Sequence, residues 1–313
     1  MHSIGYDGTV KPGALNVSYL TDQGRIRNLN EDAILTLTLP YGGLYAVADG
    51  MGGHRSGDYA SQLALKELQQ TYAKEKSPNP HRILQAVEAA NHAVYQASRA
   101  PDKRGMGTTL TTVLIEHNYA WIANIGDSRA YLYRDGHLIQ VTRDHSWVAE
   151  QVRAGIITEE EALKHTMRNV LINAMGSSRD VKLDLYMQEL QYGDILLICT
   201  DGIHGMLMDS QIEHVLKTAP FTEDKVKHLV HEANEAGGID NISAIVIEVQ
   251  KLRPQKPPIK SYNIPQNPQG LQYYYDLFGT KQQGNLLWLW VMLGGLVLLI
   301  IEVIVLTQYM PNN

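Results

Sequence analysis

Short acidic motifs recur along the first 250 residues, and most of them stand beside an apolar, β-prone segment. Each combines a carboxylate with glycine, asparagine or serine; the motifs are Asn30-Glu31-Asp32, Asp49-Gly50-Met51-Gly52-Gly53, Gly126-Asp127-Ser128, Asp201-Gly202 and Gly238-Ile239-Asp240-Asn241. A carboxylate at the end of a buried strand has a fixed backbone and one open side. Several of them meeting at one place repel each other unless a cation lies between them. The pattern predicts a metal-dependent hydrolase.

Repetition, rather than any single motif, supports this prediction. A lone Asp-Gly pair is usually an ordinary turn, but here Asp49-Gly50 and Asp201-Gly202 both follow apolar segments, and Asp240-Asn241 precedes a third. Glycine lets the chain turn sharply and lets a backbone carbonyl approach a cation, and hard cations accept both carboxylate and carbonyl oxygens. Three such motifs in one domain favour one shared metal site over three separate turns.

The composition is that of a globular protein, and the charge distribution argues against one class of partner. The 313 residues are 44% hydrophobic and 19% charged, which allows a sizeable core. Residues 251–285 carry a net charge of +4 and the segment after them −1, so the total of −6 leaves −9 on residues 1–250. A domain this acidic is not expected to bind nucleic acid, because phosphate backbones select basic surfaces.

Cysteine and histidine usage excludes several other chemistries. Cys199 is the single cysteine, so neither a disulfide within the chain nor a cysteine-based zinc site is available. The twelve histidines are scattered and form no HExxH pattern. Cys199 lies inside an apolar segment, which predicts a buried core thiol and fits a reducing compartment. Residues 1–20 lack the charged and apolar regions of a signal peptide.

Residues 1–250 alternate between strand-like and helix-like segments. The apolar patterns predict strands at 17–20, 32–39, 44–48, 108–116, 120–125, 130–134, 138–141, 183–190, 195–200 and 242–249. Amphipathic patterns predict helices at 56–74, 81–99, 146–154, 158–163, 210–217 and 222–236. Tight turns at Asn118 and Asp135-Gly136 indicate antiparallel hairpins. Hairpins with helices grouped between them predict an α+β layered domain rather than a Rossmann sheet.

The composition changes after residue 250. Five prolines among glutamine, lysine and asparagine predict an extended linker over residues 251–285. Within it, Tyr273-Tyr274-Tyr275 is either a short docking segment or a group of aromatic residues that approach a membrane surface.

Residues 286–307 are apolar apart from Glu302, and as a helix they would extend about 33 Å, enough to cross a bilayer core. A buried core helix is the alternative, but the linker separates this segment from a domain that would bury it. Trp288 and Trp290 stand at one end and Tyr309 at the other, where interfacial aromatic residues are expected. Basic residues precede the segment, which predicts a single-pass protein of the plasma membrane with a cytoplasmic N-terminal domain. Glu302 would reach the interface, be protonated or pair with another helix.

A larger set of motifs resembles the metal-dependent protein phosphatases of type 2C, in their bacterial form, from about residue 18 to 249. The set is Gly24-x-x-Arg27-x-x-Asn30-Glu31-Asp32, Asp49-Gly50-Met51-Gly52-Gly53-His54, Gly107-Thr108-Thr109, Gly126-Asp127-Ser128-Arg129-Ala130-Tyr131, Asp144-His145-Ser146, Asp201-Gly202 and Gly238-x-Asp240-Asn241. The resemblance implies a four-layer αββα sandwich, in which two antiparallel β-sheets are flanked by helix pairs. The expected chain is a phosphatase domain (1–250), a basic proline-rich linker (251–285), one C-terminal transmembrane helix (286–307) and a short tail (308–313).

The resemblance also implies which residues hold the metals, two divalent cations that are Mn²⁺ or Mg²⁺. Asp49 would bridge both cations, and Asp240 would complete one site. Asp201 and the carbonyl of Gly50 would serve the other. Asp127 with Asp201 would hold a third, weaker cation. These carboxylates are all present, which argues against a pseudophosphatase that binds phosphoproteins without hydrolysing them.

Further roles follow from the same resemblance. Arg27 matches the arginine that binds the substrate phosphate, for which its planar fork is suited; without the surrounding motifs it would be interpreted as a surface salt bridge. Glu31, Asp32 and Asn241 would lie behind the metal ligands, the two carboxylates holding metal-bound waters. His54 is a candidate general acid, and a solvated loop histidine is the alternative.

The implied reaction is hydrolysis of phosphoserine and phosphothreonine in protein substrates. Two cations that share a water lower its pKa, and the resulting hydroxide attacks phosphorus in line without a phospho-enzyme. Residues 144–176 match a variable flap beside the site. A Ser/Thr kinase is expected to act in opposition to this phosphatase, and membrane lipid is expected to contact the anchor. The alternative function is a membrane scaffold in which phosphatase activity is secondary.

Overall fold

The computed structural model describes residues 8–10, 15–52 and 56–251. His54, the predicted transmembrane segment and all but the first residue of the predicted linker lie outside the described residues. Among the residues that are described, none of the helices has the length and apolar character needed to cross a bilayer.

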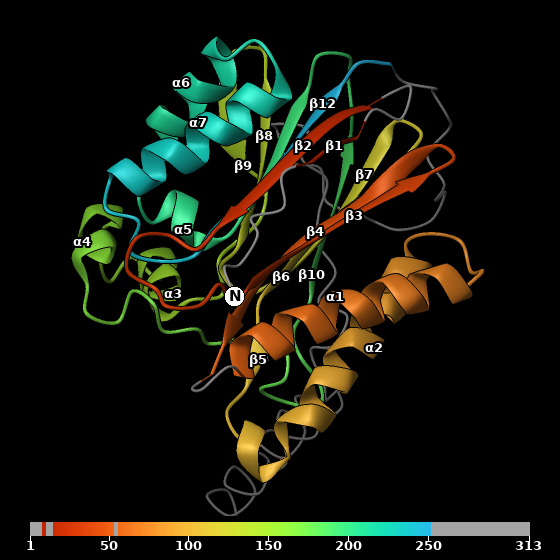
Figure 1. Ribbon diagram of the computed structural model, residues 1–313, viewed down its shortest axis with the longest axis vertical. Helices are drawn as coiled ribbons and strands as arrows, with labels where there is room; N and C mark the ends of the chain where they lie inside the picture. Colours follow the sequence, from red (N-terminus) through yellow and green to blue (C-terminus); the bar gives the residue numbers. More distant parts are fainter. Residues whose placement is uncertain (1–7, 11–14, 53–55, 252–313) are drawn as a thin grey trace, which may run out of the picture. The chain divides into compact units, whose positions relative to one another are not determined.

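The described strands form two antiparallel sheets (Figure 1). The first sheet has the order β1 (Gly8–Val10), β2 (Leu15–Asp22), β12 (Ile242–Val249), β11 (Ile195–Cys199), β8 (Arg129–Arg134) and β9 (His137–Gln140). The second has the order β10 (Asp184–Glu189), β7 (Tyr119–Ile125), β6 (Leu110–Glu116), β4 (Gly42–Met51) and β3 (Asp32–Leu39), and the short β5 (Gly107–Thr108) pairs with β4. Strand β12 lies between β2 and β11, so the last strand of the domain closes against its beginning.

Helices cover the outer faces of both sheets, as the αββα prediction requires. Helices α1 (Ser56–Lys74) and α2 (His81–Ser98) pack together, and α1 lies on β3 and β4. Helix α7 (Thr222–Glu235) lies on β2 and β12, with α6 (Asp209–Thr218) beside it. Three shorter helices, α3 (Trp147–Arg153), α4 (Glu159–Lys164) and α5 (Asp201–His204), and the 3₁₀ turn η1 (Pro101–Lys103) complete the described elements.

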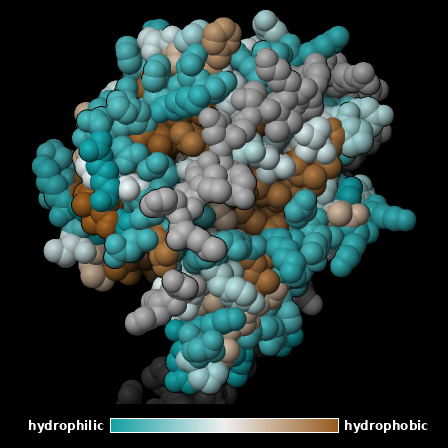
Figure 2. All heavy atoms as spheres, viewed as in Figure 1, coloured by the Kyte–Doolittle hydropathy of each residue, from teal (hydrophilic) through white to brown (hydrophobic). Residues whose placement is uncertain are grey.

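Alternation along each central strand creates one apolar core between the sheets and another under the helices. In β12, Ile245 and Ile247 point between the sheets, whereas Ala244 and Val246 point toward α6 and α7. Strand β12 is therefore apolar at nearly every position, as expected for a strand that is buried on both faces. Figure 2 shows hydrophilic side chains over the outward faces of the helices and hydrophobic ones between the layers.

The Asp201-Gly202 motif opens a helix that the sequence pattern did not indicate. The strand predicted at 195–200 ends at Cys199, and after Thr200 the chain enters α5, of which Asp201 is the first residue. The one-turn helix is too short to show a 3.6-residue apolar period, which explains why the sequence pattern missed it. Strand β1 at the described N-terminus was also not predicted.

Close backbone packing brings the fourth and fifth acidic motifs together. A Cβ atom placed on Gly202 would lie 2.0 Å from the carbonyl oxygen of Asn241, so only glycine allows this approach. The contact joins the start of α5, which carries Asp201, to the residue that follows Asp240. The fold thus uses the glycine of the Asp-Gly motif to place two carboxylates at the same end of the sandwich.

Candidate active site

The predicted carboxylates converge at one end of the two sheets. Asp32 and Asp49 face each other as partners in the register of β3 and β4. Asp201 follows β11 and Asp240 precedes β12, two strands that pair antiparallel from Cys199 and Ala244 onward. Asp127 follows β7. Asp49, Asp127, Asp201 and Asp240 are partly exposed, whereas Asp32 is buried.

Crowding of these acids is visible in their pKa values. Burial raises the pKa of Asp32 to about 7, with further contributions from the charges of Asp201 and Asp240. Burial and then the charge of Asp240 raise the pKa of Asp201 to about 6. Burial, followed by the charges of Asp32, Asp201, Asp127 and Asp240, holds the pKa of Asp49 well above its ordinary value. The acids therefore lie close enough for each to oppose ionisation of the others.

Two of the acids also have a buried carboxylate oxygen that accepts no hydrogen bond. Asp201 Oδ1 and Asp32 Oδ1 are buried without a hydrogen-bond partner. The side chains of Asp49 and Asp201 share a hydrogen bond, which lowers the pKa of Asp201 against the other effects. Within the part of the chain that the structure describes, no group of three or more His, Cys, Asp or Glu side chains is already arranged to hold a metal ion. Carboxylates with unused oxygens and mutual repulsion are nonetheless the donor set that hard divalent cations require.

Asp49 is held through its backbone by the Gly107-Thr108-Thr109 motif. The Asp49 N–H donates to Thr109 Oγ1 at 2.9 Å, and the Asp49 carbonyl accepts from the Thr109 N–H at 2.9 Å and from Thr108 Oγ1 at 2.8 Å. Thr108 and Thr109 are buried. The threonines therefore fix the backbone of Asp49 and leave its carboxylate facing the other acids.

Arg27 closes the exposed side of the carboxylate group. Its Nη2 donates to Asp240 Oδ2 at 2.6 Å, and the Arg27 side chain is 48% exposed. Partial burial opposes the charged form, but the hydrogen bond to Asp240 and the charges of Asp240, Asp49 and Asp201 outweigh it and raise the pKa of Arg27. The salt bridge that was the alternative interpretation of Arg27 is present, and its partner is one of the predicted metal ligands.

Asn241 connects the Arg27 loop to the start of β12. Its Oδ1 accepts from the Glu31 N–H at 2.8 Å, and its Nδ2 donates to the carbonyls of Gln23 at 2.9 Å and Leu29 at 2.8 Å. Asn241 is 5% exposed, so these are buried hydrogen bonds, each contributing about 1 kcal/mol to stability. The side chain fixes both ends of the segment that carries Arg27.

Glu31 and Gly50 meet at the start of α1. The Glu31 carboxylate accepts from the backbone N–H groups of Gly57 and Asp58, and the Gly50 N–H donates to the Glu31 carbonyl at 3.2 Å. A Cβ atom on Gly57 would lie 2.6 Å from Glu31 Oε1 and 2.7 Å from the Gly50 carbonyl oxygen. Glu31 thus caps the first turn of α1 beside the Gly50 carbonyl that was predicted to face a cation.

His204 contacts the Asp127 loop and was not predicted as a site residue. Its Nε2 lies 3.0 Å from the Asp127 carbonyl oxygen. Burial, and then the charge of Arg129, lower the pKa of His204 to about 3, so the ring is neutral and donates this hydrogen bond from Nε2. Asp201 and His204 stand three residues apart on α5, a spacing that places both on one face of a helix. That spacing was the available signal, but α5 itself was not predicted.

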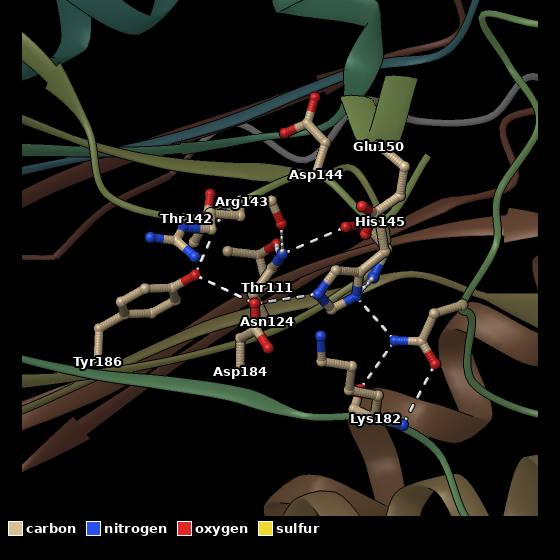
Figure 3. A network of polar contacts seen from close by, with 12 residues as sticks. Thr111, Asn124, Thr142, Arg143, Asp144, His145, Glu150, Lys182, Asp184 and Tyr186 are labelled. Atoms are coloured by element: carbon tan, nitrogen blue, oxygen red, sulfur yellow. Dashed lines mark hydrogen bonds and ion pairs between the residues drawn. The ribbon is translucent and has the colours of Figure 1, made fainter. Parts of the chain in front are cut away.

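A second buried polar network lies beside the carboxylates (Figure 3). Asn124 donates from Nδ2 to the carbonyls of Gly126 at 3.2 Å and Arg143 at 3.0 Å, and its Oδ1 accepts from Thr111 Oγ1 at 2.6 Å. His145 Nε2 lies 3.1 Å from Asp184 Oδ2, and both side chains are almost fully buried. His145 belongs to the Asp144-His145-Ser146 motif, but no role was predicted for it.

Residues 144–176, the predicted flap, connect to the sandwich mainly at their two ends. The bridge Thr108↔Met175 and the hydrogen bond from the His145 N–H to the Gly126 carbonyl attach its end and its start to the sandwich, and the bridge Ser146↔Leu171 joins its two arms to each other. Between them, α3 buries only Val148 and α4 buries no residue. Thr158 and Glu161 form a capping box at the start of α4. Asp144 at the base of the flap pairs with Arg129 at 2.8 Å.

Known proteins share this architecture and these motifs. The family described as protein phosphatase 2C matches residues 25–238. The serine/threonine phosphatase stp of Listeria monocytogenes is 35% identical over 251 residues, which covers 75% of this chain and 96% of that protein. The structure of the S. agalactiae serine/threonine phosphatase superposes with a TM-score of 0.71 at 34% identity and covers 75% of this chain and 100% of that one.

A further solved structure bears on the metal. The catalytic domain of the serine/threonine phosphatase PstP, in complex with two manganese ions, matches with a TM-score of 0.67 at 34% identity and covers 76% of this chain and 99% of that one. The carboxylates described above fit such a pair of ions in number and type. This chain therefore belongs to the protein phosphatase 2C family, whose members are metal-dependent serine/threonine phosphatases that use two Mn²⁺ or Mg²⁺ ions.

Proposed function

We propose that this chain removes phosphate from phosphoserine and phosphothreonine in proteins, from a position tethered to the cytoplasmic side of a membrane, in opposition to a Ser/Thr kinase. The observation that carries the catalytic part is the cluster of mutually repelling acids at one end of the sandwich. Burial and neighbouring acids hold the pKa of Asp49 well above its ordinary value, an arrangement that costs stability unless cations offset it.

The proposed metal ligands are Asp49 between the two cations, Asp240 at one of them, and Asp201 with the Gly50 carbonyl at the other. Asp127 is proposed to serve a third, weaker cation. The buried Asp201 Oδ1 without a hydrogen-bond partner supports its assignment. When bound, the two cations supply an acidified water as the attacking group and positive charge for the phosphoryl oxygens.

Arg27 is proposed to bind the substrate phosphate. Its guanidinium is half exposed, faces the carboxylate cluster and is held there by Asp240. A cation at Asp240 would weaken the attraction of this carboxylate for Arg27, and the half-exposed guanidinium would then be free to contact a substrate phosphate. Glu31, Asp32 and Asn241 are proposed to support the ligands from behind. Asn241 fixes the Arg27 loop, and Asp32 accepts from Thr200 Oγ1 at 2.8 Å.

The tether is proposed from composition alone. Residues 286–307 are apolar apart from Glu302, follow a linker with a net charge of +4, and are flanked by aromatic residues. A tether of this kind raises the local concentration of the enzyme near substrates and kinases at the same surface.

Removal of a proposed ligand tests the metal site. Asp201→Ala in the full chain is expected to lower Mn²⁺-dependent phosphopeptide hydrolysis at least 10²-fold, because loss of a carboxylate weakens cation binding. Asp224→Ala, the same substitution in the first turn of α7, is the control and should retain activity. Unchanged turnover of Asp201→Ala, or activity that persists in EDTA, would rule out this assignment.

Arg27 and Arg25 form a matched pair for the phosphate contact. Arg25 lies two residues away and pairs with Glu235 at the surface. Arg27→Ala is expected to reduce kcat/KM for a phosphopeptide roughly 10²-fold, because a charge-assisted contact to the phosphoryl group is lost, and Arg27→Lys should recover part of it. Arg25→Ala should behave like the wild type. Equal effects of Arg25→Ala and Arg27→Ala would contradict the phosphate role.

The raised pKa values predict an unusual pH dependence in EDTA. The folded-state pKa values of Asp32 and Asp201, about 7 and about 6, exceed the ordinary value of 3.8. The protonated acids therefore stabilise the fold fully below about pH 4, and this stabilisation is lost as pH rises through 6 and 7. In EDTA the melting temperature should rise as pH falls from 8 to 5, and Asp32→Asn should flatten this slope.

Mn²⁺ competes with these protons, so the gain in melting temperature on adding Mn²⁺ should be larger at pH 8 than at pH 5. A gain that is equal at both pH values would show that the crowded acids are not the metal-binding groups.

Membrane association is tested by deletion and by topology. The full chain should sediment with membranes and be released by detergent, whereas a chain that ends at residue 250 should remain in the supernatant. A reporter fused after Asn313 should be accessible to protease only from the non-cytoplasmic side. Equal partitioning of both chains into the supernatant would refute the tether without affecting the catalytic proposal.

A further inference from the structure

His145 lies where the flap leaves the sandwich, and it contacts three separate segments. Its side chain is 4% exposed. The contacts reach the loop that carries Asp127, the returning end of the flap at residues 172–173, and Asp184 at the start of β10. Figure 3 shows the ring of His145 with Asp184 on one side and the side chain of Asn124 nearby.

Two hydrogen bonds join His145 to Gly126, the residue before Asp127. The His145 N–H donates to the Gly126 carbonyl at 2.9 Å, and the Gly126 N–H donates to His145 Nδ1 at 3.2 Å. Gly126 has a φ angle of +103°, a conformation that side-chain-bearing residues rarely adopt. The turn that directs Asp127 toward the other acids is therefore fixed by both the backbone and the ring of His145.

The same residue holds the end of the flap. The Ile172 N–H donates to the His145 carbonyl at 2.9 Å, and Asn173 Nδ2 lies 2.7 Å from His145 Nδ1. Asn173 in turn donates to the Lys182 carbonyl at 2.8 Å and accepts from the Lys182 N–H at 3.2 Å. His145 Nδ1 thus receives one donor from the Asp127 loop and one from the flap.

Asp184 determines which ring nitrogen carries the proton. Burial works against ionisation of Asp184, but the hydrogen bond from His145, the charge of Lys182 and the hydrogen bond from Tyr186 outweigh it and lower the pKa of Asp184. Tyr186 donates its hydroxyl to the same Asp184 Oδ2 at 3.2 Å. An ionised carboxylate beside Nε2 keeps the hydrogen on that nitrogen, which leaves the lone pair of Nδ1 for Gly126 and Asn173.

We propose that His145 is a positioning residue that couples the flap, residues 144–176, to the position of Asp127, so that a cation at Asp127 and a closed flap stabilise each other. The proposal rests on the proposed function only in assigning a cation to Asp127. Coupling between two sites is reciprocal, so cation binding should protect the flap as much as flap closure favours the cation.

Two substitutions separate the two ring nitrogens. His145→Asn places an amide near Nδ1 and retains an acceptor for the Gly126 N–H, but it does not reach Asp184. His145→Gln places its amide near Nε2, can still donate to Asp184, and leaves the Gly126 N–H without an acceptor. Coupling should survive in His145→Asn and be lost in His145→Gln.

The primary measurement is trypsin cleavage of the flap after Lys164 and Arg168 in the full chain, with EDTA or with saturating Mn²⁺. Mn²⁺ is expected to slow cleavage about fivefold to tenfold in the wild type and in His145→Asn, and less than twofold in His145→Gln, as expected when one buried hydrogen bond is lost. The Asp127→Asn variant should lose the same protection by Mn²⁺, which would identify the cation at Asp127 as the one concerned.

The Asn173→Ala variant keeps the test decisive if His145→Gln does not fold. Asn173 is partly exposed, and its replacement should speed cleavage of the flap.

Arg134→Ala controls for general destabilisation. Arg134 lies at the far end of β8 from Arg129, is partly exposed, and forms an ion pair with the buried Asp194 at 2.6 Å. The Arg134→Ala variant should have a lower melting temperature, but Mn²⁺ should still protect its flap from cleavage. Phosphopeptide hydrolysis gives a second readout. The His145→Gln variant should need a higher Mn²⁺ concentration for half-maximal activity. At saturating Mn²⁺, it should raise the KM by a larger factor than it lowers kcat.

Equal Mn²⁺ protection of the flap in the wild type and His145→Gln, or none in the wild type, would overturn the coupling. Flap cleavage does not require catalysis. An inactive wild type that still shows protection lost in His145→Gln would therefore contradict the proposed function and leave the coupling intact.

Discussion

Repulsion among crowded carboxylates is the constraint on which the rest of this structure depends. Burial is the largest cause of the raised pKa values of Asp32 and Asp201, and the charge of Asp240 raises both further. The backbones of two of the acids are fixed close to the others: Asp49 by Thr108 and Thr109, and Asp201 by the close contact of Gly202 with Asn241. The fold therefore holds these carboxylates in an unfavourable arrangement, and bound divalent cations would offset the repulsion between them.

The two apolar cores of the αββα architecture stabilise the fold and offset the unfavourable crowding of the acids. The central strands are apolar on both faces, so they fill one core between the sheets and another under the helices. The ends of the same strands carry the acids. In β11, the fully buried Cys199 is followed by Thr200 and Asp201, so the chain passes from core to site within two residues. Burial raises the pKa of the Cys199 thiol, which agrees with its expected role as a core residue rather than a nucleophile.

Much of this could be predicted from the sequence, because strands with strict apolar patterns and motifs with fixed spacing are local signals. The strands at 32–39 and 242–249 and the long helices from Ser56 and His81 formed as expected. Helix α5 was missed because one turn has no periodicity. The contacts of His145 and His204 were missed because their partners, Gly126 and the Asp127 carbonyl, are backbone groups brought close only by the fold. The pairing of Arg27 with Asp240 likewise spans the sequence and had no local signal.

The central claim is that divalent cations lie between these acids and displace Arg27 from Asp240. A crystal structure of the Mn²⁺-loaded protein, with ions located by the anomalous scattering of manganese, tests it most directly. We expect two strong peaks flanking the Asp49 carboxylate at about 2.0–2.4 Å from its oxygens, with ligands from Asp201 and Asp240 and the Arg27–Asp240 contact opened. Peaks absent from Asp49, or an Arg27–Asp240 pair that remains closed beside bound manganese, would contradict it.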